Sequence, residues 1–305
     1  MKVRFKFAKY GPIRFVGHLD LMRYFEKVTR RANIDVAMTE GFSPHQILSF
    51  ANPLSLGITS DAEYVDFELK SLDLLSYEKE IPEEEKIKTF PEGAFVKIDE
   101  ECSEELKPLW NVLKAMDDQS GIGFRMLSAR VLHEWQKGEK KETAMSLVRG
   151  ADYYIQYMKP EKLKEGEDFF GDDFWDQESY IVTREKKGER ISNGHGGFKK
   201  SKVTIADVDI KPLVKDFSHE KADFLPEGTD IEKLHTSDFY DKASMHMYVR
   251  LSTGSIDNLK PEVLMQSICK FRNVEYLRSD FRIHRIEQYG QNEEGGYVAL
   301  CNMNK

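Results

Sequence analysis

The chain begins with a strict alternation of apolar and basic residues. Val3, Phe5 and Phe7 are separated by Arg4 and Lys6. Successive side chains of a β-strand point to opposite faces of a sheet, so a period of two residues is typical of a strand with one buried face. The pattern therefore predicts a strand whose apolar face packs on a core and whose other face is polar.

A second apolar pattern follows the turn at Gly11-Pro12 and has the spacing of a helix. Its apolar positions are Leu21, Phe25, Val28 and Ala32. Positions that recur every three or four residues fall on one side of a helix, which we expect over residues 18–32. The opposite side carries basic residues, so the helix is predicted to be amphipathic with a basic solvent face.

Alternation and turn residues predict the other elements of the first hundred residues. Strands are expected at 35–39, 47–51, 65–69 and 94–98, and a charge-rich helix is expected at 77–90. The order strand, helix, strand, strand, helix, strand is that of a ferredoxin-like α+β sandwich. We predict this fold for residues 1–100.

The remainder of the chain is predicted to add helices and a second α+β domain. The pattern is helical from 106 to 148, strands are expected at 153–157, 181–183, 203–209, 245–251, 281–289 and 297–301, a hairpin at 190–202 and a helix at 259–271. Strand, glycine turn and helix occur in both 3–32 and 245–271, which allows a duplication. The expected domains are 1–100, a helical insertion at 101–150, and 151–305.

Composition fits a folded protein with two cores. The chain has 305 residues, of which 40% are hydrophobic and 11% aromatic. No window resembles a membrane span and the first residues lack a signal-peptide apolar stretch, so we expect a cytoplasmic protein with no membrane partner. Cys102, Cys269 and Cys301 are too far apart in sequence for a local zinc motif. We expect neither a metal site nor a cofactor.

Charge is distributed unevenly along the chain. The formal net charge is −8, yet residues 1–46 carry nine basic and four acidic residues, a local charge of +5, whereas residues 71–120 carry fourteen acidic residues and six lysines. The basic start favours an anionic partner. The candidate binding residues are Arg14, Arg23, Lys27, Arg30 and Arg31. The alternative is an ordinary solvated helix face.

The polar face of the first strand is a second basic surface. Its residues Lys2, Arg4 and Lys6 would lie on the sheet face with which RNA-recognition sandwiches bind single strands. Asp66 and Glu68 are expected on the same face and would neutralise part of it. We therefore favour the helix over this strand as a phosphate-binding surface.

Three residues near the N-terminus are candidates for acid–base chemistry. His18 and Asp20 are two residues apart at a helix start, and His45 follows the rigid turn Gly41-Phe42-Ser43-Pro44. If the two loops meet at one edge of the sandwich, these side chains form one polar site. The alternatives are that Asp20 only complements the helix dipole, His18 packs and His45 is solvated.

Several motifs between Arg14 and Leu69 occur in a characteristic order. They are GHLD at 17–20, GFSPH at 41–45, SFANPLSLG at 49–57 and EYVD at 63–66. In this order they resemble the radical-SAM-linked protein family, a bacterial domain of unknown function. Its members are fused to, or encoded beside, a radical SAM protein. Gln46 and Ile47 stand where the family pattern has Pro and Lys, which removes a cation beside His45.

The resemblance implies a context and leaves the reaction unassigned. The three dispersed cysteines cannot supply the local three-cysteine motif of a radical SAM enzyme. We therefore expect a non-catalytic accessory protein that works with a radical SAM enzyme, with RNA modification as the candidate process. The alternative is an independent RNA-binding or RNA-processing ferredoxin-like protein that uses His18, Asp20 and His45. A third possibility is an interaction protein that binds through the acidic stretch 71–120.

Overall fold

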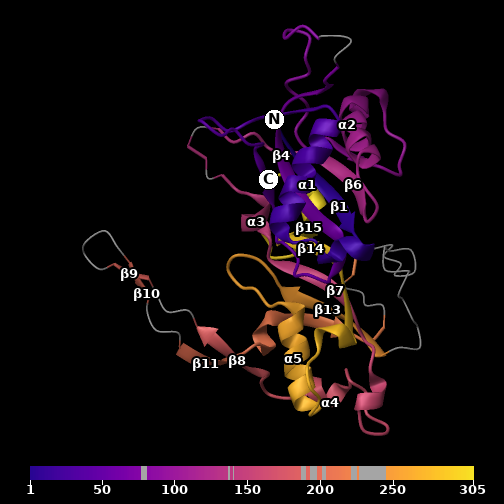
Figure 1. Ribbon diagram of the computed structural model, residues 1–305, viewed down its shortest axis with the longest axis vertical. Helices are drawn as coiled ribbons and strands as arrows, with labels where there is room; N and C mark the ends of the chain where they lie inside the picture. Colours follow the sequence, from indigo (N-terminus) through magenta and orange to yellow (C-terminus); the bar gives the residue numbers. More distant parts are fainter. Residues whose placement is uncertain are drawn as a thin grey trace.

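The computed structural model has strands and helices arranged around one large sheet (Figure 1). It describes residues 1–76, 81–136, 138–139, 141–186, 190–192, 198–200, 204–220, 225–226 and 245–305. The helices are α1 (His18–Arg31), α2 (Lys107–Asp118), α3 (Ala144–Leu147), α4 (Asp172–Trp175) and α5 (Pro261–Phe271). The α+β class predicted from the sequence is confirmed.

Within the described residues, eleven strands form the large sheet. Its main path is β12 (Val214–Ser218), β13 (Met245–Ser252), β7 (Gly150–Tyr157), β14 (Phe281–Gln291), β4 (Thr59–Leu74), β1 (Lys2–Lys9), β6 (Phe124–Val131) and β5 (Phe95–Lys97). Beside this path, β2 (Ile34–Val36) and β3 (Leu48–Phe50) pair with β4, and β15 (Tyr297–Ala299) pairs with β14. The paired strands are antiparallel except β14 and β4, which are parallel. This parallel pair joins the two halves of the sheet.

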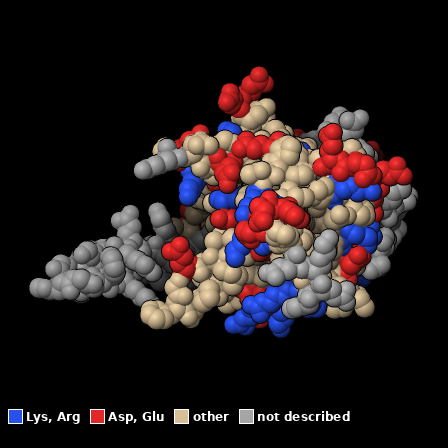
Figure 2. Space-filling model, turned by 90° about the horizontal axis from the view of Figure 1, so that it is seen from above, with Lys and Arg blue, Asp and Glu red and all other residues tan. Residues whose placement is uncertain are grey.

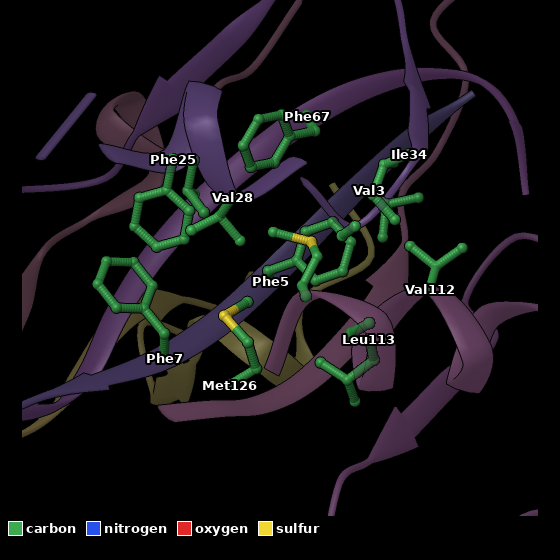
Figure 3. Close-up of a cluster of buried hydrophobic side chains, with 14 of the residues drawn as sticks. Val3, Phe5, Phe7, Phe25, Val28, Ile34, Phe67, Val112, Leu113 and Met126 are labelled. Carbon is green, nitrogen blue, oxygen red and sulfur yellow. The ribbon is translucent and has the colours of Figure 1, made fainter. Parts of the chain in front are cut away.

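The first half confirms the predicted strand and amphipathic helix. Val3, Phe5 and Phe7 of β1 are fully buried and lie under α1 and α2. Figure 3 shows Phe25 and Val28 of α1 in the same cluster. The order β6-β1-β4-β2 places β1 between two antiparallel partners. Since the sheet continues from β4 into β14, the ferredoxin-like description of residues 1–100 stays a prediction.

The helix predicted at 77–90 is wrong over the residues that the structure describes, 81–90. This segment has a single turn at 82–85 but no helix, and it follows the end of β4: the amide of Leu72 donates to the carbonyl of Ile87 at 3.0 Å, and the amide of Ile87 donates to Asp73 at 2.7 Å. Pro82 and three consecutive glutamates leave no apolar stripe that would hold a helix on the core. The second helix of this half is α2.

The helical pattern expected from 106 to 148 holds for α2 but fails at 124–131. These residues form β6, which pairs with β1. Leu127 and Val131 have helical spacing, but Phe124 and Met126 are buried with the period of a strand, and sheet pairing prevails. The stretch 101–150 is therefore not a purely helical insertion.

The second half repeats one connection of the first half. Helix α5 joins β13 to β14, and β7 lies between these two strands, as β4 lies between the strands joined by α1. The strand expected at 281–289 and its pairing with 297–301 are confirmed by β14 and β15. A duplication of the two halves stays a prediction.

Two short strand pairs are separate from the large sheet. They are β8 (Ile181–Lys186) with β11 (Thr204–Asp209), and β9 (Arg190–Ser192) with β10 (Phe198–Lys200). Strands β9 and β10 lie well away from the large sheet (Figure 1). The hairpin expected at 190–202 thus has two paired strands, while its tip at 193–197 lies outside the described residues. Among the described residues, no helix has both the length and the apolar composition that crossing a bilayer requires.

Candidate functional site

The polar face of β1 is covered around the buried Arg4, with Lys2 and Lys6 half-buried, and does not form an open RNA-binding surface. Arg4 is only 1% exposed, and its Nε donates to Asp66 at 2.8 Å. Its Nη1 donates to the carbonyl of Leu300 at 3.3 Å, so the segment after β15 covers this face. Lys6 pairs with Glu287 of β14 at 2.6 Å. The sequence predicted the neutralisation by Asp66, but the covering C-terminal segment had no sequence signal.

His18 is the first residue of α1, and its ring packs against an apolar side chain instead of a polar one. Its ring lies edge-on to Phe50, with ring centroids 5.1 Å apart, and its Nδ1 is buried without a hydrogen bond. Burial lowers the pKa of His18 below the ordinary value of 6.5; the charge of Lys9 acts in the same direction and that of Glu63 opposes it. His18 is therefore neutral at pH 7.

Asp20 and His45 make contacts of their own. Asp20 forms an exposed ion pair with Arg23 at 3.4 Å. His45 is exposed, and its Nδ1 lies 3.1 Å from the hydroxyl of Thr39. The next residue, Gln46, accepts a hydrogen bond from Thr29 at 2.9 Å. His45 is thus anchored beside the last turns of α1.

The structure does not bring the three acid–base candidates into one site. Thr29 is eleven residues after His18, so these two residues are ~16 Å apart along the helix axis. Among the described residues, no contact joins His18, Asp20 and His45. The predicted position of His45 at a turn is right, but the shared polar cluster is absent from this arrangement.

The basic residues of α1 lie on its exposed side, as the amphipathic pattern predicts. Arg23, Lys27, Arg30 and Arg31 are exposed. Arg31 also donates to the carbonyl of Gln119, after α2, at 2.8 Å. In Figure 2, which views the molecule from above, Lys and Arg side chains gather at the lower edge and on the right-hand side, and Asp and Glu side chains lie mainly across the top and the centre.

Arg14 lines a cleft whose walls come from both halves of the molecule. The cleft has a volume of about 670 Å³. Its lining residues are Arg14, Phe15, Leu56, Gly57, Thr59, Arg278, Ser279, Phe281, Arg282 and Ile283. The set contains three arginines and no acidic residue. We refer to this cavity as the arginine cleft.

Gly57 joins the walls of the arginine cleft. Its amide donates to the carbonyl of Arg14 at 2.8 Å, and its carbonyl accepts from Nη2 of Arg278 at 2.9 Å. Its φ is +84°, in the left-handed region that glycine adopts without strain. A Cβ here would lie 3.4 Å from Nη2 of Arg278 and 3.7 Å from the Phe15 ring. The residue therefore fixes how close the two walls approach.

The parallel strand pair forms the floor of the cleft. Thr59 at the start of β4 is opposite His284 of β14, and the Thr59 hydroxyl lies 2.9 Å from His284 Nδ1. Next to this pair, Nε of Arg285 donates to Glu63 at 3.1 Å. These buried contacts hold together β4 and β14; Arg282 lies on β14, and Arg278 lies in the short helix that precedes it.

Sequence reasoning identified Arg14 but missed Arg278 and Arg282. These residues are far from Arg14 in sequence, and their proximity depends on the pairing of β14 with β4. One local signal was present: Arg282 is the polar position between Phe281 and Ile283, which alternation marks as exposed. Within the described residues, no group of His, Cys, Asp and Glu side chains has an arrangement that could hold a metal ion.

Comparison with known proteins found a family conserved in bacteria that matches the N-terminal part of the chain. No curated protein sequence matches the chain. The matched family is described as "Uncharacterized protein conserved in bacteria (DUF2344)". The match covers β1, α1 and the strands up to β4 and includes Arg14 and Gly57, whereas Arg278 and Arg282 lie outside it. Residues 2–87 of this chain are thus similar to an uncharacterized family conserved in bacteria.

Proposed function

We propose that this chain is a non-catalytic accessory protein that binds RNA and works with a radical SAM enzyme. The observation that carries the proposal is the arginine cleft, a cavity with three guanidinium groups and no acidic lining residue. Arginine binds phosphate through paired N–H donors and stacks on bases, so it suits RNA better than an uncharged ligand. The basic face of α1 follows Arg14 closely in the chain and supplies further exposed cations for an RNA strand.

The separation of the acid–base candidates favours binding over catalysis. Asp20 and His45 have their own partners, and His18 packs against Phe50. General acid–base cleavage of RNA needs such groups within hydrogen-bond reach of the same reacting atoms. The processing alternative would therefore need another arrangement of these residues. We expect His18→Ala and His45→Ala to leave bound RNA intact, as the unmodified chain does.

The radical SAM partner is proposed from the order of motifs between Arg14 and Leu69. Two of these motifs have structural roles here: GHLD starts α1, and the last glycine of SFANPLSLG is Gly57 in the cleft. Cys269 is buried, and burial raises its pKa to about 12, which disfavours the thiolate that binds a metal cluster. The partner would therefore supply the radical chemistry.

Two measurements test this function. Fluorescence anisotropy of the full chain with a labelled 12-nucleotide single strand of RNA should show saturable binding, and Arg23→Glu combined with Lys27→Glu should weaken it. Lys270→Glu, an exposed cation on α5, is the control. Co-purification with a radical SAM protein encoded beside this chain should yield a complex. No RNA binding, together with no complex at micromolar concentration, would contradict the proposal.

A further inference from the structure

The arginine cleft has the dimensions of a small-ligand site. Its volume of about 670 Å³ lies within the range of cavities that enclose one small ligand. An extended RNA strand is much longer than such a cavity. The cleft therefore suits one nucleotide, with the adjoining chain outside it.

The charge of the cleft favours a phosphate. The nearest acidic side chain in sequence is Asp280, which follows the lining residue Ser279, but Asp280 is buried and pairs with Lys162 at 2.5 Å. Its charge is thus balanced outside the lining set. Arg14, Arg278 and Arg282 line the cavity and no acidic residue does, which gives it a positive field.

Arg278 is fixed in place before any ligand binds. Its Nη1 donates to the carbonyl of Phe281 and its Nη2 to the carbonyl of Gly57, each at 2.9 Å. Its Nε is buried and has no hydrogen-bond partner. Carbonyl groups orient a guanidinium without neutralising it, so its charge remains available to an anion and little side-chain entropy is lost on binding.

The apolar part of the cleft favours a nucleoside over phosphate alone. Phe15 lines the cavity and is 64% exposed, and the guanidinium carbon of Arg14 lies 4.9 Å from the centre of its ring. Leu56, also in the lining, is 57% exposed. Inorganic phosphate gains nothing from such side chains, whereas a base stacks on an aromatic ring with an arginine beside it.

We propose that the arginine cleft binds a nucleoside 5′-phosphate, with the phosphate at Arg278 and Arg282 and the base on Phe15. The inference rests on the proposed function for its RNA context, and the same chemistry is offered by a free nucleotide and by one nucleotide of an RNA strand. Binding there would place a defined position of the strand at the junction of the two halves.

The test is a calorimetric titration of the full chain with uridine 5′-monophosphate and adenosine 5′-monophosphate, compared with uridine and with inorganic phosphate. Both monophosphates should bind more tightly than either part alone. Arg282→Glu and Phe15→Ala should each weaken nucleotide binding by about tenfold or more, because the first removes a phosphate-binding group and the second a stacking surface. Lys270→Glu and Phe42→Ala, an exposed cation and an exposed phenylalanine outside the cleft, are the matched controls.

Competition distinguishes this inference from the proposed function. If the monophosphate displaces the labelled RNA, then the free nucleotide and a nucleotide of the RNA strand bind in the same cleft, which supports the inference. If the monophosphate binds and RNA does not, the inference stands for free nucleotides and the proposed RNA function fails. If RNA binds but nucleotides bind no better than inorganic phosphate, or if Arg282→Glu and Phe15→Ala behave as the controls do, the inference is overturned while RNA binding elsewhere survives.

Discussion

The side chain of Arg278 donates a hydrogen bond from Nη2 to the carbonyl oxygen of Gly57 at 2.9 Å, across 221 residues of sequence. This hydrogen bond ties the short helix before β14 to the loop before β4. Gly57 also holds the backbone of Arg14, so arginines from both halves of the chain meet at one residue. The cleft therefore depends on the backbone conformation of Gly57.

We expect Gly57→Ala to weaken RNA binding and to cost about 1–2 kcal/mol of unfolding free energy, because alanine at a φ of +84° is strained and its Cβ would touch the Phe15 and Arg278 side chains. Gly295→Ala is the control, since its φ is +82° with open space around it. Urea unfolding should give similar losses for the two variants, and anisotropy should detect weaker RNA binding for Gly57→Ala alone. Equal RNA affinities would contradict the role of Gly57 in the cleft.

The buried pair Arg4–Asp66 predicts an asymmetric mutational response. Arg4→Met leaves the carboxylate of Asp66 buried and unpaired, which should cost ~3–5 kcal/mol in urea unfolding. Arg4→Met combined with Asp66→Leu removes both charges and should recover most of that loss. A double variant as unstable as Arg4→Met would mean that packing, and not the unpaired charge, determines the cost.

The histidines predict opposite pH effects on stability. The pKa of His18 is lowered by burial, so the unfolded chain binds its proton more strongly, and the unfolding free energy should fall as the pH decreases below about 6.5. His18→Phe should make this fall less steep. Hydrogen bonds with Glu92 and Glu139 raise the pKa of His133, so its protonation stabilises the fold at low pH and His133→Gln should make the fall steeper. Urea unfolding between pH 7 and pH 5 measures both slopes, and identical slopes for the two variants would refute the assignment.

The exposed face of α1 predicts a salt effect. If Lys27 and Arg30 neutralise RNA phosphates, replacing both with alanine should reduce the slope of log affinity against log salt by roughly 0.7 for each phosphate that is no longer neutralised. Lys270→Ala should leave the slope unchanged. Anisotropy titrations at several salt concentrations provide the comparison, and an unchanged slope in the double variant would restrict RNA binding to the cleft.

Local patterns predicted the elements whose own residues determine them. The alternation around Phe5 and the apolar stripe at Leu21, Phe25 and Val28 identified β1 and α1, since both elements bury one face in the same core. Residues 124–131 were predicted to be helical because Leu127 and Val131 are four residues apart. They form a strand because they pair with β1, and no local pattern reports that pairing. The cleft could not be predicted from local patterns for the same reason. Arg14 and Arg278 line one cavity because β4 and β14 pair in parallel.

The most direct test of RNA binding in the arginine cleft is the affinity of the full chain for a labelled single-stranded RNA after charge reversal inside and outside the cleft. Arg282→Glu should weaken binding by about tenfold or more, since it replaces a phosphate-binding guanidinium with a repulsive carboxylate. Lys270→Glu makes the same change in net charge on α5 and should leave the affinity nearly unchanged. Equal losses of affinity in the two variants would show that RNA senses only the overall charge, which would contradict binding in the cleft.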